Sequence, residues 1–122
     1  MAAELTCILV VEDEPLIRFA MVDYLQDAGY QVLEASNSTD AITLLERHPE
    51  IQAMFTDVDM PGGVTGLLLS EAVRDRWPPI HIIITSGKSS YLPDQLPIRA
   101  IFIAKPYDPA EIVVRFRELV EA

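Results

Sequence analysis

The chain has 122 residues, close to the usual size of one domain, and half of them are hydrophobic, which suits a packed core and excludes a disordered chain. Nine Lys and Arg stand against nineteen Asp and Glu, so the formal net charge is −10. Direct binding to nucleic acid or to an anionic membrane depends on basic side chains that face phosphates, and this balance disfavours both.

The sequence carries no signal for a membrane or for secretion. No apolar run reaches the roughly 18 residues of a membrane-spanning helix, and Met1 to Glu4 lack the basic residues of a signal peptide. The single cysteine, Cys7, cannot form an internal disulfide and is predicted to be a small buried hydrophobic residue. We therefore expect a cytoplasmic protein without membrane insertion.

Short apolar runs alternate with amphipathic segments from the start of the chain. Cys7–Val11 is too short for a helix and rich in β-branched residues, which predicts a buried strand. Apolar residues at helical spacing then predict a helix over Leu16–Ala28, with Pro15 suited to its first turn and Gly29 at the usual stop. Gln31–Ala35 alternates in part, as expected of a less buried edge strand.

The middle of the chain repeats this alternation. Asn37 or Ser38 can cap a second helix, which is predicted to end before Pro49. The apolar run Ile51–Thr56 predicts a third strand that leads directly to Asp57. A glycine-rich turn comes next and separates this strand from the following helix.

The third helix is predicted over Thr65–Arg76, because the sequence Trp77-Pro78-Pro79 breaks the helical pattern. Ile80–Thr85 is the most strand-like run in the chain, and Ile98–Ala104 predicts a fifth strand. Between them, Lys88–Pro97 interrupts the alternation, since its prolines allow at most a short helix.

The last helix opens with a proline, Pro109, directly after the capping residue Asp108, and Glu111 stands at the capping-box position. Its apolar stripe consists of Ile112, Val113, Phe116, Leu119 and Val120. Parallel strands need crossover helices, so the regular alternation predicts an α/β fold with a doubly wound, five-stranded parallel sheet covered on both faces. We expect a single domain over residues 1–122.

Polar side chains follow the predicted strands at the points where the strands end. Glu12 and Asp13 follow the first strand, Asp57 the third, Ser86 the fourth and Lys105 the fifth. Ligand sites of open parallel sheets form outside the carboxyl ends of the strands, so these side chains are predicted to meet at one edge. Acids, a hydroxyl and an ammonium in one place favour chemistry on a phosphoryl group.

Three carboxylates in one small site repel each other, and a divalent cation relieves that repulsion. Hard oxygen ligands with room for water suit Mg²⁺, with Mn²⁺ as the substitute. Such an ion would neutralise charge on a transferred phosphoryl group and hold it in line with an Asp57 oxygen. The Ser86 hydroxyl and the Lys105 ammonium can both donate to phosphoryl oxygens.

Each of these residues also has a purely structural interpretation. Asp57 could begin a turn, Glu12 and Asp13 could cap the first helix, Ser86 could belong to a turn, and Lys105 could be a solvated loop residue. Their shared place at the strand ends favours the functional interpretation. His48 and His81 have no Cys or His at metal-ligand spacing, so structural roles are expected for both.

Taken in chain order, four short motifs resemble the receiver domain of two-component response regulators, whose simplest member is the chemotaxis response regulator. They are Glu12-Asp13, Asp57-Val-Asp-Met-Pro61, Thr85-Ser86-Gly87 and Lys105-Pro106. The resemblance runs from Cys7 to Val120 and implies a flavodoxin-like sheet of order 2-1-3-4-5. It also implies a signalling protein that catalyses only its own phosphorylation and dephosphorylation and is not otherwise an enzyme.

By this resemblance Asp57 is the phospho-acceptor, and its donor is a histidine kinase or a histidine phosphotransfer protein. Glu12, Asp13 and Asp57 would hold Mg²⁺ together with the backbone carbonyl of Asp59. The phosphorylated form would bind an unidentified downstream protein or pass the phosphoryl group on in a relay. No output domain is expected in the chain.

The resemblance gives Lys105 the role of contacting the phosphate, and the proline that follows it is typically cis. Ser86 takes the switch position, and Phe102 matches the aromatic that couples a Ser86 shift to the outer surface. The implied switch is a change in the populations of two states.

The chain departs from the family pattern in two places. The family has a helix where Lys88–Ile98 carries two prolines, so partner identity does not carry over. Position 59 is acidic and position 88 is basic. In the family that the chain resembles, side chains at these two positions flank the path of the attacking water. An unusual phosphoryl lifetime is expected.

Three other functions compete with this one. Asp57 and Asp59 after a strand also resemble the nucleophile and acid of haloacid-dehalogenase phosphatases, although that pair follows the first strand of a larger domain. A flavodoxin-like FMN carrier shares the topology, but Glu12-Asp-Glu-Pro15 is hostile to a phosphate. A pseudo-receiver would keep the fold and bind proteins without phosphorylation.

Overall fold

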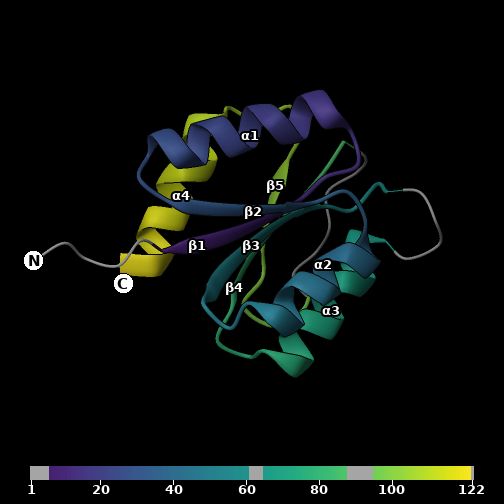
Figure 1. The fold of residues 1–122 in the computed structure, drawn as a ribbon. Helices are drawn as coiled ribbons and strands as arrows, with labels where there is room; N and C mark the ends of the chain where they lie inside the picture. Colours follow the sequence, from purple (N-terminus) through teal and green to yellow (C-terminus); the bar gives the residue numbers. More distant parts are fainter. Residues whose placement is uncertain (1–5, 61–64, 88–94, 122) are drawn as a thin grey trace, which may run out of the picture.

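The computed structural model describes residues 6–60, 65–87 and 95–121. Their strands form one parallel sheet with the order β2-β1-β3-β4-β5 (Figure 1). The strands are β1 Cys7–Val11, β2 Gln31–Ala35, β3 Ile51–Asp57, β4 His81–Ser86 and β5 Ile101–Ala104. The predicted topology and strand order are confirmed.

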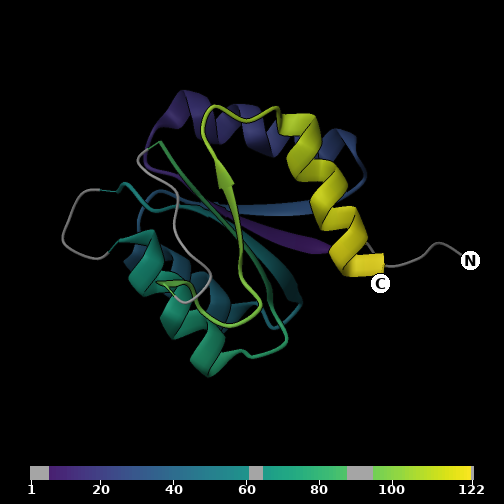
Figure 2. The ribbon, with the colours of Figure 1, turned by 180° about the vertical axis from the view of Figure 1, so that it is seen from behind.

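In the described part of the chain, two helices cover each face of the sheet. The helices α1 Pro15–Asp27 and α4 Pro109–Glu121 lie together on one face. The helices α2 Ser38–Arg47 and α3 Gly66–Arg76 lie on the other face, and the view from behind shows the same two layers (Figure 2). This arrangement leaves the carboxyl ends of the strands at one edge of the sheet.

The helix ends use the capping chemistry that the sequence indicates. The Asn37 side chain accepts a hydrogen bond from the Asp40 amide at 2.8 Å, so Asn37 caps α2. Thr65 caps α3 by accepting from the Leu68 amide at 3.2 Å. Helix α1 starts at the predicted proline, and Gly29 follows its end with a φ of 99°, a left-handed conformation that favours glycine.

Burial follows the expected pattern of a sheet enclosed on both sides. All of β1 is buried, whereas the edge strand β2 is partly exposed, as its alternating sequence predicts. One core cluster packs under α2 and α3 and includes Leu9, Leu45, Met54, Leu69 and Ile84. The other packs under α1 and α4 and includes Ile8, Leu25, Phe55, Ile83 and Phe116. Cys7 is buried with a free thiol, as predicted.

The fifth strand is shorter than its apolar run. The prediction of a strand over Ile98–Ala104 is wrong for its first three residues, because β5 begins at Ile101. Arg99 has a φ of 64°, and the Ala100 amide donates to the Pro97 carbonyl, so the chain turns here before it pairs with β4. Of the irregular segment Lys88–Pro97, residues 88–94 lie outside the described part. No helix of the described residues is long and apolar enough to cross a membrane.

Candidate functional site

The sheet brings the predicted polar residues to one edge. Asp57 is the last residue of β3 and Ser86 the last residue of β4, while Glu12 directly follows β1 and Lys105 directly follows β5. Asp57 pairs in register with Thr85, and Ser86 pairs with Ala104, so these strand ends are level with one another. His48 and His81 lie at the opposite end of the sheet, where the His48 ring contacts Glu50 at 3.0 Å.

Both carboxylate oxygens of Asp57 have a hydrogen-bond partner. The residue is only 2% exposed. Its Oδ2 accepts from the Lys105 ammonium at 2.5 Å, and its Oδ1 accepts from the backbone amide of Asp59 at 2.9 Å. A buried carboxylate is stable only when it is paired and hydrogen-bonded in this way. The contacts hold Asp57 in one orientation at the mouth of its strand.

Lys105 is positioned by the backbone on both sides. Its amide donates to the Ser86 carbonyl at 3.0 Å, and the bond to Pro106 is cis, as the family resemblance implies. Burial acts to lower the pKa of the Lys105 ammonium, but the hydrogen bond and charge of Asp57 outweigh it, and the net pKa is raised. Lys105 therefore stays charged beside the Asp57 carboxylate.

Ser86 is fully buried and is bound to an acid other than Asp57. Its hydroxyl donates to Asp59 Oδ2 at 2.9 Å, and the Gly87 amide donates to the same oxygen at 3.4 Å. The side chain of Asp59 thus contacts the end of β4, while its amide contacts Asp57. The sequence did not predict this pairing, since it depends on the path of the chain after β3.

Glu12 is a buried acid with one unsatisfied oxygen. It is 2% exposed, and its Oε2 accepts from the Glu14 amide at 3.0 Å. Its Oε1 has no hydrogen-bond partner among the described residues. Burial, followed by the charge of Asp57 and the adjacent half-buried Asp13, raises the pKa of Glu12 to about 7. A buried acceptor with no donor, among several acids, fits a hard cation.

The predicted metal ligands are not assembled as a side-chain cluster. Across residues 6–60, 65–87 and 95–121, no three His, Cys, Asp or Glu side chains are grouped so that they could hold a metal ion. The Asp57 carboxylate instead contacts Lys105, and the Asp59 carboxylate contacts Ser86. The predicted set also includes the backbone carbonyl of Asp59, which is not a side-chain ligand. The metal site stays a prediction.

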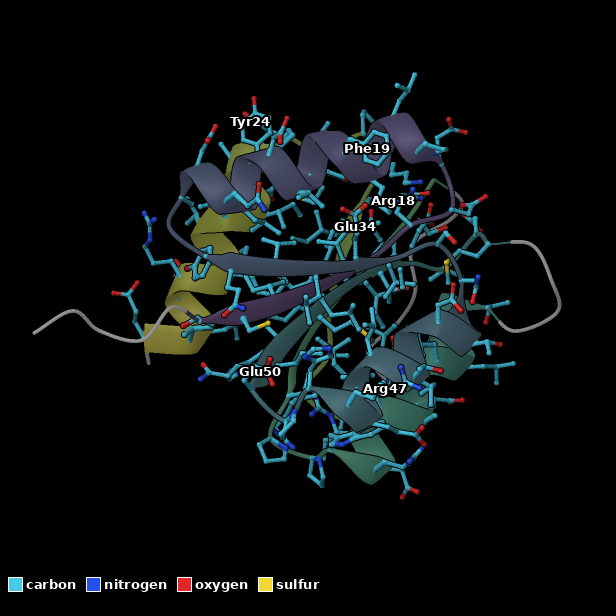
Figure 3. All side chains as sticks on the ribbon, in the orientation of Figure 1. Arg18, Phe19, Tyr24, Glu34, Arg47 and Glu50 are labelled. Carbon is cyan, nitrogen blue, oxygen red and sulfur yellow. The ribbon has the colours of Figure 1, made fainter. Side chains whose placement is uncertain are left out.

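Arg18 fixes the loop that carries the first two acids. Its Nη1 donates to the Glu12 carbonyl at 3.0 Å, and its Nε pairs with Glu34 at 2.8 Å. Figure 3 shows Arg18 and Glu34 close together beneath α1. This contact ties helix α1 and strand β2 to the backbone of Glu12. Nothing in the sequence pattern singled out Arg18.

Gly66 is a second contributor that the sequence pattern did not reveal. A Cβ at this position would lie 2.0 Å from the Asp57 carbonyl oxygen and 2.9 Å from Thr56 Oγ1. Only a glycine permits this approach, so Gly66 allows α3 to start directly against the end of β3. The signal that could have found it is a glycine placed directly after the capping Thr65, a poor helix former at a helix start.

Tyr107 lines the site from the loop after β5. Its ring packs edge to face on Phe55 with centroids 5.7 Å apart. Burial, followed by the charges of Glu12 and Asp57, raises the pKa of the Tyr107 hydroxyl to about 12. Phe102 lies on β5, pairs in register with Ile84 and is partly buried. Its switching role stays a prediction.

An apolar groove of about 610 Å³ borders the site between α1 and the loop after β5. Its lining includes Leu16, Ile17, Met21, Lys105 and Tyr107. Leu16 is 77% exposed, so the groove presents apolar surface to solvent beside the Lys105 ammonium.

Known proteins are similar to this chain in both sequence and fold. Residues 8–117 match the family model of the response regulator receiver domain. The hydrogenase transcriptional regulatory protein HoxA of Cupriavidus necator is 34% identical over an alignment of 122 positions that covers 94% of this chain and 24% of HoxA. The aerobic respiration control protein ArcA of Escherichia coli K12 is 28% identical over 116 residues, covering 93% of this chain and 48% of ArcA. The chain thus spans about half of ArcA and about a quarter of HoxA.

Solved structures of receiver proteins have the same fold as this chain. A response regulator receiver protein from Sinorhizobium medicae superposes with a TM-score of 0.89 at 24% identity, covering 99% of this chain and 98% of that one, which establishes the fold. A response regulator receiver protein from Pseudomonas putida has a TM-score of 0.80 at 26% identity and covers 98% of both chains. On the match of residues 8–117, the chain belongs to the response regulator receiver domain family.

Proposed function

We propose that this receiver domain accepts a phosphoryl group on Asp57 from a histidine kinase or a histidine phosphotransfer protein. The observation that carries the proposal is the Asp57 carboxylate itself. It is buried at the mouth of β3, contacts the Lys105 ammonium and lies level with the end of β4. A rigid carboxylate with a fixed cation beside it is arranged for transfer of a group that carries negative charge.

The proposed transfer forms one bond and breaks one bond. An Asp57 carboxylate oxygen bonds to phosphorus, while the bond from phosphorus to the donor's imidazole nitrogen breaks and its electron pair returns to the ring. Lys105, now bound to Asp57, can donate to a phosphoryl oxygen once one is present. The Ser86 hydroxyl can donate to another. The chemistry is confined to phosphorylation and dephosphorylation of this one side chain.

The acids of the site fit Mg²⁺ or Mn²⁺. Glu12, Asp13, Asp57 and the backbone carbonyl of Asp59 would hold the ion, and the unsatisfied Glu12 Oε1 supports this assignment. When bound, the ion supplies positive charge that offsets the charge of the transferred phosphoryl group.

The groove beside Lys105 supports docking of the phosphodonor. A donor must bring its histidine to Asp57, so it must cover the surface that borders the site. That surface is apolar around Leu16 and Ile17, and Tyr24 projects from α1 away from the sheet (Figure 3). Exposed apolar side chains next to a functional site are typical of protein interfaces.

The proposed output is a change of state read by another protein, or transfer of the phosphoryl group to a further histidine. New charge on Asp57 would favour states in which Ser86 and Lys105 contact it. Phe102 lies on the strand that pairs with β4, so it can respond to movement of Ser86. Action in the cytoplasm stays a prediction.

The competing functions gain no support from the comparisons. A phosphatase would use Asp59 as its acid, yet the Asp59 carboxylate accepts hydrogen bonds from Ser86 and Gly87. The FMN carrier would need phosphate contacts after β1, where Glu12 is buried and acidic. A pseudo-receiver would share this fold and differ from a receiver domain only in not being phosphorylated. An experiment is therefore needed to distinguish the two.

Incubation with acetyl phosphate and Mg²⁺, followed by measurement of intact mass, tests the proposal. We expect one phosphoryl adduct on the wild-type chain and none on Asp57→Asn, which keeps the size of the side chain. Asp23→Asn, an exposed α1 variant with the same change of charge, should keep the adduct. Failure of the wild-type chain to form any adduct, or an equal adduct on Asp57→Asn, would refute the proposal. Repeated hydrolysis of an external phosphomonoester would favour the phosphatase instead.

A further inference from the structure

The two groups expected to contact the phosphoryl oxygens are each bound to a carboxylate in the unmodified protein. Lys105 is bound to Asp57, the residue that is modified, so its partner gains the phosphoryl group. Ser86 is bound to Asp59, which is not modified. The two contacts therefore have different fates when Asp57 is phosphorylated. The Ser86 contact with Asp59 opposes the modified state.

The Asp59 side chain is well placed to hold Ser86. Ser86 Oγ lies 2.9 Å from Asp59 Oδ2, and the same oxygen accepts from the Gly87 amide at 3.4 Å. Ser86 is fully buried, so water does not compete freely for its hydroxyl. Hydrogen bonds to an ionised acceptor are stronger than neutral ones, and burial strengthens them further.

A serine hydroxyl has a single hydrogen and donates to one acceptor at a time. Ser86 cannot donate to Asp59 and to a phosphoryl oxygen on Asp57 together. Asp59 also stays close to Asp57, because its own amide donates to Asp57 Oδ1 at 2.9 Å. Its negative charge therefore lies near the new phosphoryl charge and repels it.

We propose that the Asp59 carboxylate is a positioning residue that holds Ser86 away from the phosphoryl site and so favours the unphosphorylated state. Modification of Asp57 must break the contact between Ser86 and Asp59, which releases the end of β4 together with the Gly87 amide. The proposal rests on the proposed function, since it describes the switch of the same site. It assigns a regulatory role to the Asp59 side chain, separate from the expected metal contact of its backbone carbonyl.

Beryllofluoride, a non-covalent mimic of the phosphoryl group, tests the proposal by titration in the presence of Mg²⁺. We expect Asp59→Ala to bind beryllofluoride about tenfold more tightly than the wild-type chain. The variant lacks the hydrogen bond that competes for the Ser86 hydroxyl, and it lacks the negative charge that repels the ligand. Asp59→Asn keeps a weaker neutral acceptor, so its gain should be smaller, about threefold. Asp23→Asn makes the same change of net charge away from Ser86 and should leave the affinity unchanged.

A double-mutant cycle with Ser86→Ala separates the hydrogen bond from the charge. Without the hydroxyl, the gain from Asp59→Ala should fall by at least about threefold, because only relief of repulsion remains. Should Asp59→Ala not fold, as judged by circular dichroism, the same cycle with Asp59→Asn replaces it. In that cycle too the gain should fall with Ser86→Ala, to the part that relief of charge repulsion supplies.

An equal gain with and without the Ser86 hydroxyl would overturn the proposal, since it would show a charge effect alone. An unchanged affinity for beryllofluoride in both Asp59 variants would also overturn the proposal. In that case, binding of beryllofluoride by the wild-type chain would leave the proposed function intact. Failure of the wild-type chain to bind beryllofluoride and to accept a phosphoryl group would overturn both.

Discussion

At the scale of single residues, Gly66 determines how closely helix α3 approaches the strand that carries Asp57. A Cβ at Gly66 would lie 2.0 Å from the Asp57 carbonyl oxygen, and backbone cannot move aside as a flexible side chain can. The nearest heavy atom to a Cβ on Gly87 would be Lys105 Cδ at 3.8 Å, an ordinary contact. These two glycines of the same site thus offer a matched comparison.

Gly66→Ala should lower the free energy of unfolding by about 2–3 kcal/mol, because the start of α3 must move away from β3. The same movement should slow phosphorylation of Asp57. Gly87→Ala should change stability by less than about 1 kcal/mol. Chemical denaturation of the two variants checks this, and equal stability losses would contradict the role of Gly66.

The individual site residues were predictable to different degrees. Asp57, Ser86 and Lys105 stand at the ends of apolar runs, so their meeting at one edge follows from the topology. The contact of Ser86 with Asp59 does not follow, because it depends on how the backbone turns after β3. The sequence pattern does not reveal the role of Gly66 for a similar reason, since the close neighbour of Gly66 is a backbone carbonyl oxygen and not a side chain.

At the scale of the elements, Arg74 connects α3 with the backbone just ahead of β4 and just ahead of β5. It is 8% exposed, and its guanidinium donates to the carbonyls of Pro78 and Ile80 ahead of β4 and of Ile98 ahead of β5, each at 2.7 Å. Buried carbonyls that lose their donors are costly. Arg74 thereby stabilises the turn that shortens β5.

Arg74→Met keeps most of the buried apolar volume but removes all three donors. We expect the free energy of unfolding to fall by about 3 kcal/mol, since one buried and two part-buried hydrogen bonds to backbone carbonyls are lost. Arg47→Gln removes an exposed guanidinium from the last turn of α2 and should change stability by less than about 0.5 kcal/mol. Urea denaturation compares the two, and a small loss for Arg74→Met would contradict the assigned role.

Helices and strands were predicted well where periodicity is strong and poorly where the chain turns within an apolar run. The bounds of β1 and β2 agree with the prediction, since both runs are short and flanked by polar or turn residues. The run Ile98–Ala104 is apolar enough for a strand, but Arg99 adopts a left-handed φ of 64° and ends the pattern. The contact of Arg74 with the Ile98 carbonyl spans 24 residues and leaves no local signal.

At the scale of the whole molecule, the fold places one acidic site at one end of a rigid sheet. The regular alternation of strands and helices predicts the doubly wound topology, because parallel neighbours require crossovers. The net charge of −10 is in part the charge of this site, where Glu12, Asp13, Asp57 and Asp59 follow two neighbouring strands. The sequence does not reveal which partners these acids have in the folded chain.

Asp57, and no other acid of the site, is expected to form the acyl phosphate. Borohydride reduces an aspartyl phosphate to homoserine, so phosphorylated protein can be reduced, digested and analysed by peptide mass spectrometry. We expect homoserine in the peptide that contains position 57, and at that position alone. Homoserine at Asp13 or Asp59, or none in protein that carries a phosphoryl adduct, would contradict it.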